Sequence, residues 1–215
     1  MAKKVLKKGL FITFEGCEGC GKSTHSRLLY EYLKKLGYEC TITREPGGTR
    51  AGEEIRKILL HSEDISISDV TELFLFESAR AEITRQIIRP ALDKKRVVIC
   101  DRFSDATLAY QGYGAGIPAK IIKILDRVAT DGIKPDLTLV LDIDIATGLA
   151  RAKRKGYDRI EKKALGYHKR VRAGYLKIAA KEPARVKVVR LEEDIDVTQN
   201  NIRSRVSRVI QRYKR

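Results

Sequence analysis

Residues 16–24 read GCEGCGKST, and this stretch decides which fold the chain can adopt. Its thiols have the Cys17-x-x-Cys20 spacing of a redox pair or of half a zinc site. Its glycines, lysine and serine have the G-x-x-x-x-G-K-S spacing of a phosphate-binding loop. The flanking residues favour the loop, because residues 10–14 form an apolar run typical of a buried strand and a helical pattern of leucines begins after Lys22. A strand, a glycine loop and a helix in this order predict phosphate binding.

The cysteine pattern lacks the partners that a metal site needs. A structural zinc ion takes four ligands, and His25, His61 and His168 are scattered, with no second Cys or His pair at a suitable spacing. Cys17 and Cys20 then occupy variable positions of the loop. A reversible disulfide between them, which would distort the loop, stays open as a minor alternative.

Every residue of the loop is expected to contact a bound triphosphate. Glycines let successive backbone N–H groups curve around an anion, and the helix that follows adds positive partial charge at its N-terminus. Lys22 is predicted to reach the terminal phosphates, and the Ser23 hydroxyl to ligate Mg²⁺. The residues expected to bind the triphosphate are Gly16, Cys17, Glu18, Gly19, Cys20, Gly21, Lys22, Ser23 and Thr24.

The rest of the chain predicts an α/β fold. Further strands are expected at residues 38–43, 96–100, 137–141 and 186–191, and helices at residues 22–36, 51–60, 69–88 and 121–128. Asp69 is expected to cap the third of these helices, which should end before Pro90. Strands that alternate with helices indicate a five-stranded parallel sheet flanked by helices on both faces, in three layers. The carboxyl ends of the strands, and any ligand, then share one edge of the sheet.

The composition bounds the size of the core and the kind of partner. With 215 residues, 43% of them hydrophobic, the chain is expected to form one domain over residues 1–215. Its formal net charge of +16 favours polyanionic partners, such as phosphorylated substrates, nucleic acid or an anionic membrane surface. The basic residues are spread along the chain rather than gathered in one tail, so nucleic acid is not the expected partner.

Nothing in the sequence predicts a membrane segment or an export signal. The apolar run at residues 10–14 is shorter than the core of a signal peptide, and no run approaches the ~20 residues of a membrane span. We therefore expect a cytoplasmic protein whose cysteines are free thiols.

Charged residues follow several of the predicted strands. Arg44 follows the second strand, Asp101 and Arg102 follow the third, and a basic cluster at residues 151–159 follows the fourth. Cations in such places can hold an acceptor phosphate and neutralise charge on a transferring phosphoryl group. The Asn-Lys-x-Asp base-reading motif of GTPases is absent from the sequence. The pattern therefore predicts a phosphoryl-transfer enzyme.

A series of motifs along most of the chain resembles the thymidylate kinase family. They are FEGCEGCGKST at residues 14–24, TREPGGT at 43–49, LFESAR at 75–80, DRF at 101–103, AYQG at 109–112, PDLTLVLD at 135–142 and DRIE at 158–161. The combination of TREPGGT with DRF is the most specific part. The resemblance implies a P-loop NTPase fold with a short lid at about residues 151–161. It further implies ATP and Mg²⁺ as the donor system, transfer of the ATP γ-phosphoryl group to dTMP to give dTDP, and a homodimer.

The resemblance also implies roles for individual residues at the acceptor. Glu18 would accept a hydrogen bond from the sugar 3′-hydroxyl, and Phe76 would stack on thymine. Asp101 would orient a water on Mg²⁺ or support Arg102, so it joins Ser23 as an expected metal-site residue. The residues expected to bind dTMP are Glu18, Arg44, Pro46, Phe76, Arg80, Arg102, Tyr110 and Gln111.

The resemblance implies that the catalytic cation is either an arginine in the loop or a basic residue in the lid. The loop has no arginine at its variable positions, so the lid is the expected place. Arg154 is the favoured residue, with Arg151 and Arg159 as competitors. The lid differs from the usual family pattern, because Lys155 stands where an arginine is expected and the segment before Asp158 is one residue short. The expected catalytic set is completed by Lys22, Asp101 and Arg102.

Two other functions remain compatible with the sequence. One is a kinase for a different nucleoside monophosphate, because recognition of the thymine methyl group is worth only ~1–3 kcal/mol. The other is a nucleic-acid-binding protein that retains a nucleotide fold, which the net charge of +16 permits. For the homodimer, an apolar helix face at about residues 73–83 would provide the contact surface.

Overall fold

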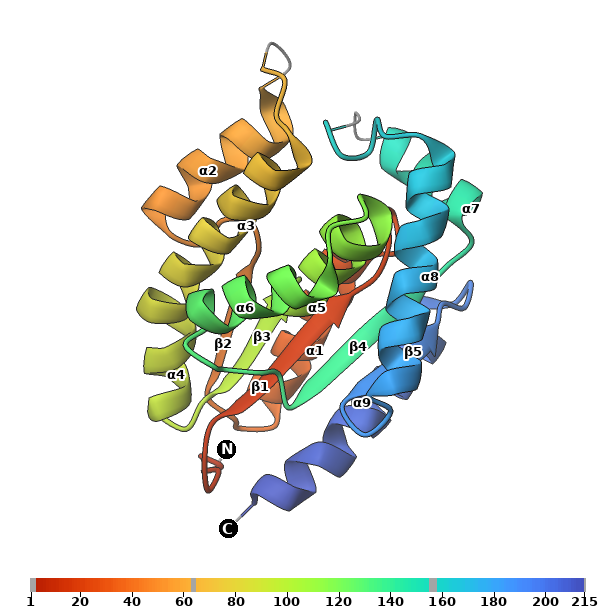
Figure 1. Ribbon diagram of the computed structural model, residues 1–215. Helices are drawn as coiled ribbons and strands as arrows, with labels where there is room; N and C mark the ends of the chain where they lie inside the picture. The colour runs from red at the N-terminus through yellow and green to blue at the C-terminus, as the bar shows by residue number, and fades with distance from the viewer. Residues whose placement is uncertain (1–2, 63–64, 155–157, 215) are drawn as a thin grey trace.

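The computed structural model describes residues 3–62, 65–154 and 158–214. Within them, five strands form one parallel sheet in the order β2-β3-β1-β4-β5 (Figure 1). The strands are β1 (Leu10–Glu15), β2 (Cys40–Arg44), β3 (Val97–Asp101), β4 (Leu137–Asp142) and β5 (Val186–Arg190). Each of them overlaps a strand predicted from the sequence, so the five-stranded parallel sheet is confirmed.

The segments between the strands are largely helical. The α-helices are α1 (Lys22–Lys35), α2 (Arg50–His61), α3 (Asp69–Ile83), α4 (Arg89–Asp93), α5 (Ser104–Thr107), α6 (Ala119–Ala129), α7 (Ile145–Lys153), α8 (Leu165–Lys181) and α9 (Ile195–Tyr213). Two π-helical segments are η1 (Thr84–Ile88) and η2 (Leu108–Gly114). Among the described residues, no helix combines the length and the apolar character needed to cross a membrane.

Helices cover both faces of the sheet (Figure 1). On one face, α1 and α9 pack against β1, β3 and β4 through apolar residues that include Leu29 and Ile202. On the other face, η1 packs against β1 and β3 through Ile88, and α8 packs against β4 and β5 through Val171 and Tyr175. Because both faces are covered, β1 is apolar along most of its length and fully buried. The three-layer α/β architecture is thereby confirmed.

The predicted helix 69–88 is wrong at both of its ends. Its N-cap is Ser68 rather than Asp69, because Ser68 Oγ accepts the backbone N–H of Thr71 at 3.1 Å. At the other end, the helix continues through η1 into α4 and so passes Pro90. Pro90 lies in the first turn of α4, where the missing backbone N–H costs no helical hydrogen bond.

The register of the sheet gathers charged residues at one edge. Arg44, the last residue of β2, is paired with Asp101, the last residue of β3. Asp101 is also paired with Phe14, one residue before the end of β1. The phosphate-loop sequence leaves the sheet at this edge, after Glu15. As predicted for a parallel sheet, the candidate site therefore lies along the carboxyl ends of the strands.

Candidate active site

The loop between β1 and α1 has a backbone that requires glycine at several positions. Gly16, Gly19 and Gly21 have φ angles of 130°, 67° and 77°. A Cβ atom on Gly19 would lie 1.9 Å from the carbonyl oxygen of Gly148 in α7. Both the conformation and the lack of space therefore exclude larger residues. The glycines of the motif are needed for the curve of this loop, as the phosphate-loop interpretation predicts.

Lys22 lies at the start of α1, with its side chain folded across the loop. Its Nζ donates to the carbonyl oxygens of Cys17 at 2.9 Å and Gly16 at 3.2 Å. Beside it, Ser23 Oγ donates to Asp101 Oδ2 at 2.5 Å. The structure thus brings the predicted phosphate-binding lysine together with the two residues predicted for the metal site.

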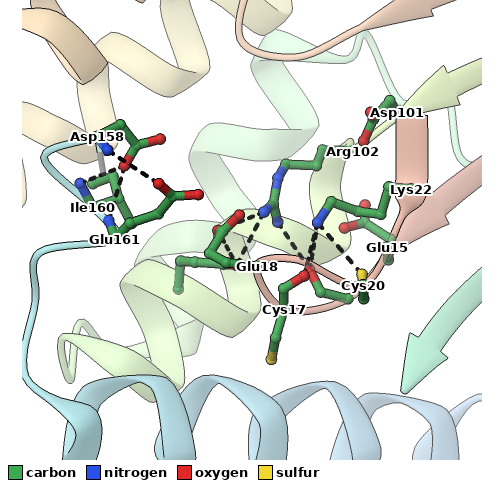
Figure 2. A network of polar contacts seen from close by, with 12 residues as sticks. Glu15, Cys17, Glu18, Cys20, Lys22, Asp101, Arg102, Asp158, Ile160 and Glu161 are labelled. Carbon is green, nitrogen blue, oxygen red and sulfur yellow. Dashed lines mark hydrogen bonds and ion pairs between the residues drawn. The ribbon is translucent and has the colours of Figure 1, made fainter. Parts of the chain in front are cut away.

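The two cysteines of the loop are buried free thiols. Cys20 Sγ accepts a hydrogen bond from Lys22 Nζ at 3.6 Å, whereas the Cys17 side chain points away from Lys22 (Figure 2). Burial and the neighbouring Cys20 raise the pKa of Cys17 to about 12, so its reactive thiolate form is scarce at neutral pH. Among the described residues, no group of three or more His, Cys, Asp or Glu side chains is arranged to hold a metal ion. The geometry favours neither the redox nor the zinc interpretation.

Arg102, the first residue after β3, joins the sheet edge to the loop. Its φ of 70° is unusual for a residue other than glycine and turns the chain sharply at this point. Its Nη2 donates to Glu18 Oε1 at 2.6 Å, and its Nη1 donates to the carbonyl oxygen of Gly16 at 3.2 Å (Figure 2). Arg102 Nη2 also donates to the hydroxyl of Tyr110 at 3.1 Å. One planar guanidinium therefore holds the loop and a side chain of η2 in a fixed relation.

Glu18 is kept ionised by its neighbours. Burial raises the pKa of its carboxyl group, but Arg102, Lys22 and the hydrogen bond from Tyr110 lower it by more, to about 2. The Tyr110 hydroxyl donates to Glu18 Oε1 at 2.6 Å. An ionised carboxylate accepts hydrogen bonds only, so Glu18 is suited to receive one from a sugar hydroxyl.

A second buried carboxyl group, Glu15, lies at the end of β1 and was not singled out from the sequence. The Phe103 N–H donates to its Oε1 at 2.7 Å, and the Tyr175 hydroxyl donates to its Oε2 at 2.8 Å. Burial and the charge of Asp105 raise the pKa of Glu15 to about 8. At neutral pH this group therefore holds a proton. A glutamate at the end of an otherwise apolar strand was the available signal for it.

The donor loop and the predicted acceptor residues line one cavity of about 600 Å³. This volume is typical of a site for a small organic ligand. The loop contributes Glu18, Gly19, Gly21, Lys22, Ser23 and Thr24 to its wall. Every residue predicted to bind dTMP also lines it: Glu18, Arg44, Pro46, Phe76, Arg80, Arg102, Tyr110 and Gln111.

Arg80 is part of a buried ionic network rather than a surface pair. The residue is 1% exposed, and its Nη2 and Nε donate to Glu45 Oε2 at 2.7 and 3.0 Å. Its Nη1 donates to Glu77 Oε1 and to the Thr107 hydroxyl, both at 2.8 Å. These contacts leave one N–H of Nη2 for other partners. Glu45, which precedes the predicted Pro46, was missed as a site residue although it also lines the cavity.

Two further arginines, from β2 and α2, line the cavity. Arg44 is exposed, and its Nη2 donates to Glu53 Oε1 at 2.8 Å and Oε2 at 3.0 Å. Arg56 lines the cavity, and its Nη1 donates to the carbonyl oxygen of Pro46 at 2.8 Å. Arg56 could not be predicted from the sequence, since a single arginine on an amphipathic helix belongs to no recognisable motif.

The lid arginines occupy different environments. Arg151, near the end of α7, is exposed and lines the cavity, whereas Arg154 is exposed and does not. Arg159 Nη2 donates to Glu72 Oε2 at 2.6 Å, on α3. Lys155, within the predicted lid, lies outside the described residues.

Two acidic residues of the DRIE motif also line the cavity, although they were not predicted as site residues. The Asp158 carboxylate accepts the backbone N–H groups of Ile160 and Glu161, each at 2.8 Å (Figure 2). Glu161 Oε2 accepts the Asp158 N–H at 3.0 Å. Burial raises the pKa of both carboxyl groups. These bonds hold the motif in a compact turn that faces Glu18 and Arg102 (Figure 2).

The glycine loop lies between the central strand β1 of a parallel sheet and helix α1, and it shares one cavity with cations from the strand ends. These features define a P-loop phosphotransferase of the nucleotide kinase class. Comparison with known proteins narrows this class. The sequence model of thymidylate kinases matches residues 14–202. The chain therefore belongs to the thymidylate kinase family, as the motifs suggested.

Individual thymidylate kinases agree with this placement. A thymidylate kinase of Dehalococcoides mccartyi is 51% identical over 176 residues, which cover 82% of this chain and 85% of the relative. A thymidylate kinase of Symbiobacterium thermophilum is 44% identical over 203 residues, with coverage of 94% and 95%. The crystal structure of thymidylate kinase from Ehrlichia chaffeensis is similar with a TM-score of 0.76 at 35% identity, over 93% of this chain and 99% of that one.

Proposed function

We propose that this protein transfers the γ-phosphoryl group of ATP to dTMP, giving ADP and dTDP for dTTP synthesis. The observation that carries the proposal is the shared cavity: residues of the donor loop and every predicted dTMP-binding residue line it. Membership of the thymidylate kinase family and relatives with that name support it.

The donor side is assigned to the phosphate loop. Lys22 would exchange its bonds to the Gly16 and Cys17 carbonyl oxygens for bonds to the terminal phosphates. The hydroxyl of Ser23 and the carboxylate of Asp101 are hard oxygen donors of the kind that Mg²⁺ prefers, and their 2.5 Å contact puts both within reach of one ion. When bound there, Mg²⁺ would neutralise charge on the phosphates of ATP.

The acceptor side is assigned to the predicted dTMP-binding residues, which form the acceptor wall of the same cavity. Glu18 would accept a hydrogen bond from the 3′-hydroxyl, and the half-buried Phe76 would stack on the base. Arg44 and Arg102 would hold the acceptor phosphate. The remaining residues of this wall, Pro46, Arg80, Tyr110 and Gln111, would surround the nucleoside.

Positioning and charge neutralisation would supply most of the catalysis. Phosphoryl transfer needs the attacking and leaving oxygens in line, with cations around the transferring group. Lys22, Arg102 and a lid arginine are the cations assigned to this task. Arg151 is the favoured lid arginine because it lines the cavity. We propose residues 151–161 as the lid of a single domain spanning residues 1–215.

A coupled assay of ADP release with dTMP, dUMP, UMP, CMP and AMP tests the proposed activity. We expect the highest kcat/KM with dTMP, and a loss of at least about 100-fold in Lys22→Met, because this variant removes a cation that contacts the transferring group. Faster turnover of UMP or CMP would contradict the assignment of dTMP as the acceptor. Salt-dependent DNA binding without any phosphoryl transfer would favour the nucleic-acid alternative.

We also propose that the enzyme is a cytoplasmic homodimer. The apolar face predicted at residues 73–83 is wrong in part, because Leu73 and Ile83 are buried in the core of the chain. Exposed apolar residues instead lie on the adjacent helices α3 and α6: Val70, Phe74, Ile121, Ile124 and Val128. A second copy of the chain is the proposed cover for this patch, since large exposed apolar side chains on adjacent helices mark a candidate interaction site.

Light scattering coupled to size-exclusion chromatography tests the dimer. The wild-type protein should have twice the mass of the chain, and Phe74→Glu with Ile124→Glu should be monomeric, because two charges at the patch would have to be desolvated in the dimer. Leu176→Glu, a change at an exposed leucine of α8, serves as the control and should stay dimeric. A wild-type monomer would contradict the proposal.

A further inference from the structure

Glu72 connects the acceptor wall to the last residues of the lid and to the segment that follows it. It lies on α3 and is fully buried. Its Oε1 accepts a hydrogen bond from Gln111 Nε2 at 2.8 Å, on η2. Its Oε2 accepts one from Arg159 Nη2 at 2.6 Å, and Lys163 Nζ lies 3.2 Å from the same oxygen. Neither the family motifs nor the proposed reaction assigns a role to this carboxylate.

The surroundings of Glu72 determine which end of the Gln111 amide it can bind. A carboxylate between two cations acts only as an acceptor, whereas an amide has a donor end at Nε2 and an acceptor end at Oε1. Gln111 must therefore direct Nε2 toward Glu72 and Oε1 away from it. Gln111 lines the cavity, and within the described part of the chain no donor is bonded to its Oε1. The amide presents its acceptor end to a ligand.

We propose that Glu72 is a positioning residue that sets base specificity by fixing the orientation of the Gln111 amide. With Oε1 toward the ligand, the site favours pyrimidine bases that carry a proton on N3, which are thymine and uracil. Cytosine has an acceptor at N3 and would face a second acceptor there. This inference rests on the proposed function, in which Gln111 lies beside the base of the acceptor nucleotide.

The physical basis is the cost of an unmatched polar contact. A site built to bond one donor rejects a ligand that lacks it, because two acceptors in contact are left desolvated without a shared proton. Thymine and uracil are not separated by this device, since both carry N3–H. Glu72 therefore affects selectivity against cytosine only.

The same carboxylate ties base recognition to the lid segment. Arg159 Nε also donates to the carbonyl oxygen of Leu59 at 2.8 Å, at the end of α2. Glu72 therefore holds both the end of the lid, at Arg159, and the base-facing amide of Gln111. Arg159, one of the candidate catalytic arginines, serves here to hold Glu72 as an acceptor.

Isothermal titration calorimetry with dTMP, dUMP and dCMP tests the role of Glu72. In Glu72→Gln, residue 72 can donate as well as accept, so Gln111 can turn Nε2 toward the ligand. We expect the preference for dTMP over dCMP, measured as a ratio of Kd, to fall by at least about 10-fold. The preference for dTMP over dUMP should stay within about 2-fold of wild type, because both bases carry N3–H. Ratios of kcat/KM for the three acceptors give an independent readout.

Asp69→Asn is the matched control. Asp69 Oδ1 lies 3.4 Å from Lys163 Nζ, so the change removes a carboxylate from the same lysine on the same helix without touching Gln111. Its dTMP-to-dCMP ratio should equal that of wild type. An equal loss of selectivity in Asp69→Asn and Glu72→Gln would overturn the inference, since it would trace the effect to the lid segment alone.

Two further variants separate the possible failures. If Gln111→Leu keeps the wild-type ratio, Gln111 does not read the base, and both its proposed place beside the base and the role of Glu72 are wrong. If Gln111→Leu lowers the ratio but folded Glu72→Gln keeps it, only the role of Glu72 is overturned. Should Glu72→Gln not fold, Glu72→Asp keeps the charge opposite Arg159 and withdraws the carboxylate from Gln111; an unchanged ratio in that variant also overturns the inference.

Discussion

Arg102 Nη2 donates a hydrogen bond to Glu18 Oε1 at 2.6 Å, and this ion pair joins the end of β3 to the phosphate loop. Glu18 belongs to the loop that is assigned to ATP, and its carboxylate is also assigned to the sugar of the acceptor. Arg102 contacts both the loop backbone and Tyr110 of the acceptor wall. This ion pair is therefore the structural link between the donor and acceptor halves of the cavity.

The first prediction concerns the planar fork of Arg102. Arg102→Lys keeps the charge but cannot contact Gly16, Glu18 and Tyr110 together. We expect kcat/KM with dTMP to fall by at least about 100-fold, the size of effect typical when a transition-state contact is lost. Arg89→Lys, which alters an exposed pair with Asp131, should stay within about 2-fold. Similar small changes in both variants would contradict the role of Arg102.

The second prediction separates the lid arginines. Because Arg151 lines the cavity, Arg151→Ala is expected to lower kcat by about 100-fold with a smaller effect on the KM for dTMP. Arg154→Ala should lower kcat by less than about 10-fold, since a residue outside the wall contributes less to the reacting group. Lys153→Ala, at an exposed neighbour on α7, is the control. A larger loss of kcat in Arg154→Ala than in Arg151→Ala would contradict this prediction and support Arg154, the arginine favoured from the sequence.

The third prediction concerns Glu15 and the pH dependence of stability. Its pKa of about 8 in the folded protein lies above the usual 4.5. Between these values the folded protein keeps a proton that the unfolded chain has released, so the free energy of unfolding falls as the pH rises through this window. Glu15→Gln mimics the protonated group and lacks this titration. The variant should therefore gain stability relative to wild type, by on the order of 4 kcal/mol from about pH 5 to pH 8.

Urea unfolding of both proteins across that pH window measures the difference. Parallel stability profiles for wild type and Glu15→Gln would mean that Glu15 is already ionised in the folded protein at neutral pH, and the assignment of a bound proton would be wrong.

The fourth prediction contrasts two arginines of the acceptor wall. Arg80→Met leaves the buried Glu45 and Glu77 without their cation, so the free energy of unfolding should fall by ~3–5 kcal/mol. Arg44→Met breaks an exposed pair with Glu53 and should cost less than ~1 kcal/mol. Chemical unfolding of both variants at pH 7 gives the comparison. An equal decrease in the free energy of unfolding for both variants would show that burial does not determine how much these ion pairs contribute to stability.

Much of the site could be predicted because its residues sit in short motifs next to strands. Lys22 and Ser23 begin α1 after the loop that follows β1, and Asp101 and Arg102 stand at the end of β3, so strand prediction alone brings them to one edge. Arg56 and Glu72 could not be found in this way. They lie at ordinary positions of helices, and their roles depend on partners that approach only after the chain has folded.

The burial of single residues was also beyond the reach of the sequence. Leu73 and Phe74 are adjacent apolar residues of α3, yet Leu73 is 1% exposed and Phe74 is 53% exposed. A helical pattern identifies an apolar stripe but not which part of it the other elements cover. The surface assigned to the dimer therefore had to be moved from the predicted face to α3 and α6.

The sequence by itself determined the phosphate loop, the order of strands and helices, and membership of the thymidylate kinase family, because these depend on spacing along the chain. Tertiary structure decided which arginines are buried, which lid residue lines the cavity, and that Glu72 bonds Gln111 and Arg159. Those contacts join residues 39 and 87 positions apart. Hydrogen bonds and ion pairs act over a few ångströms of space, so only the packing of distant segments can create them.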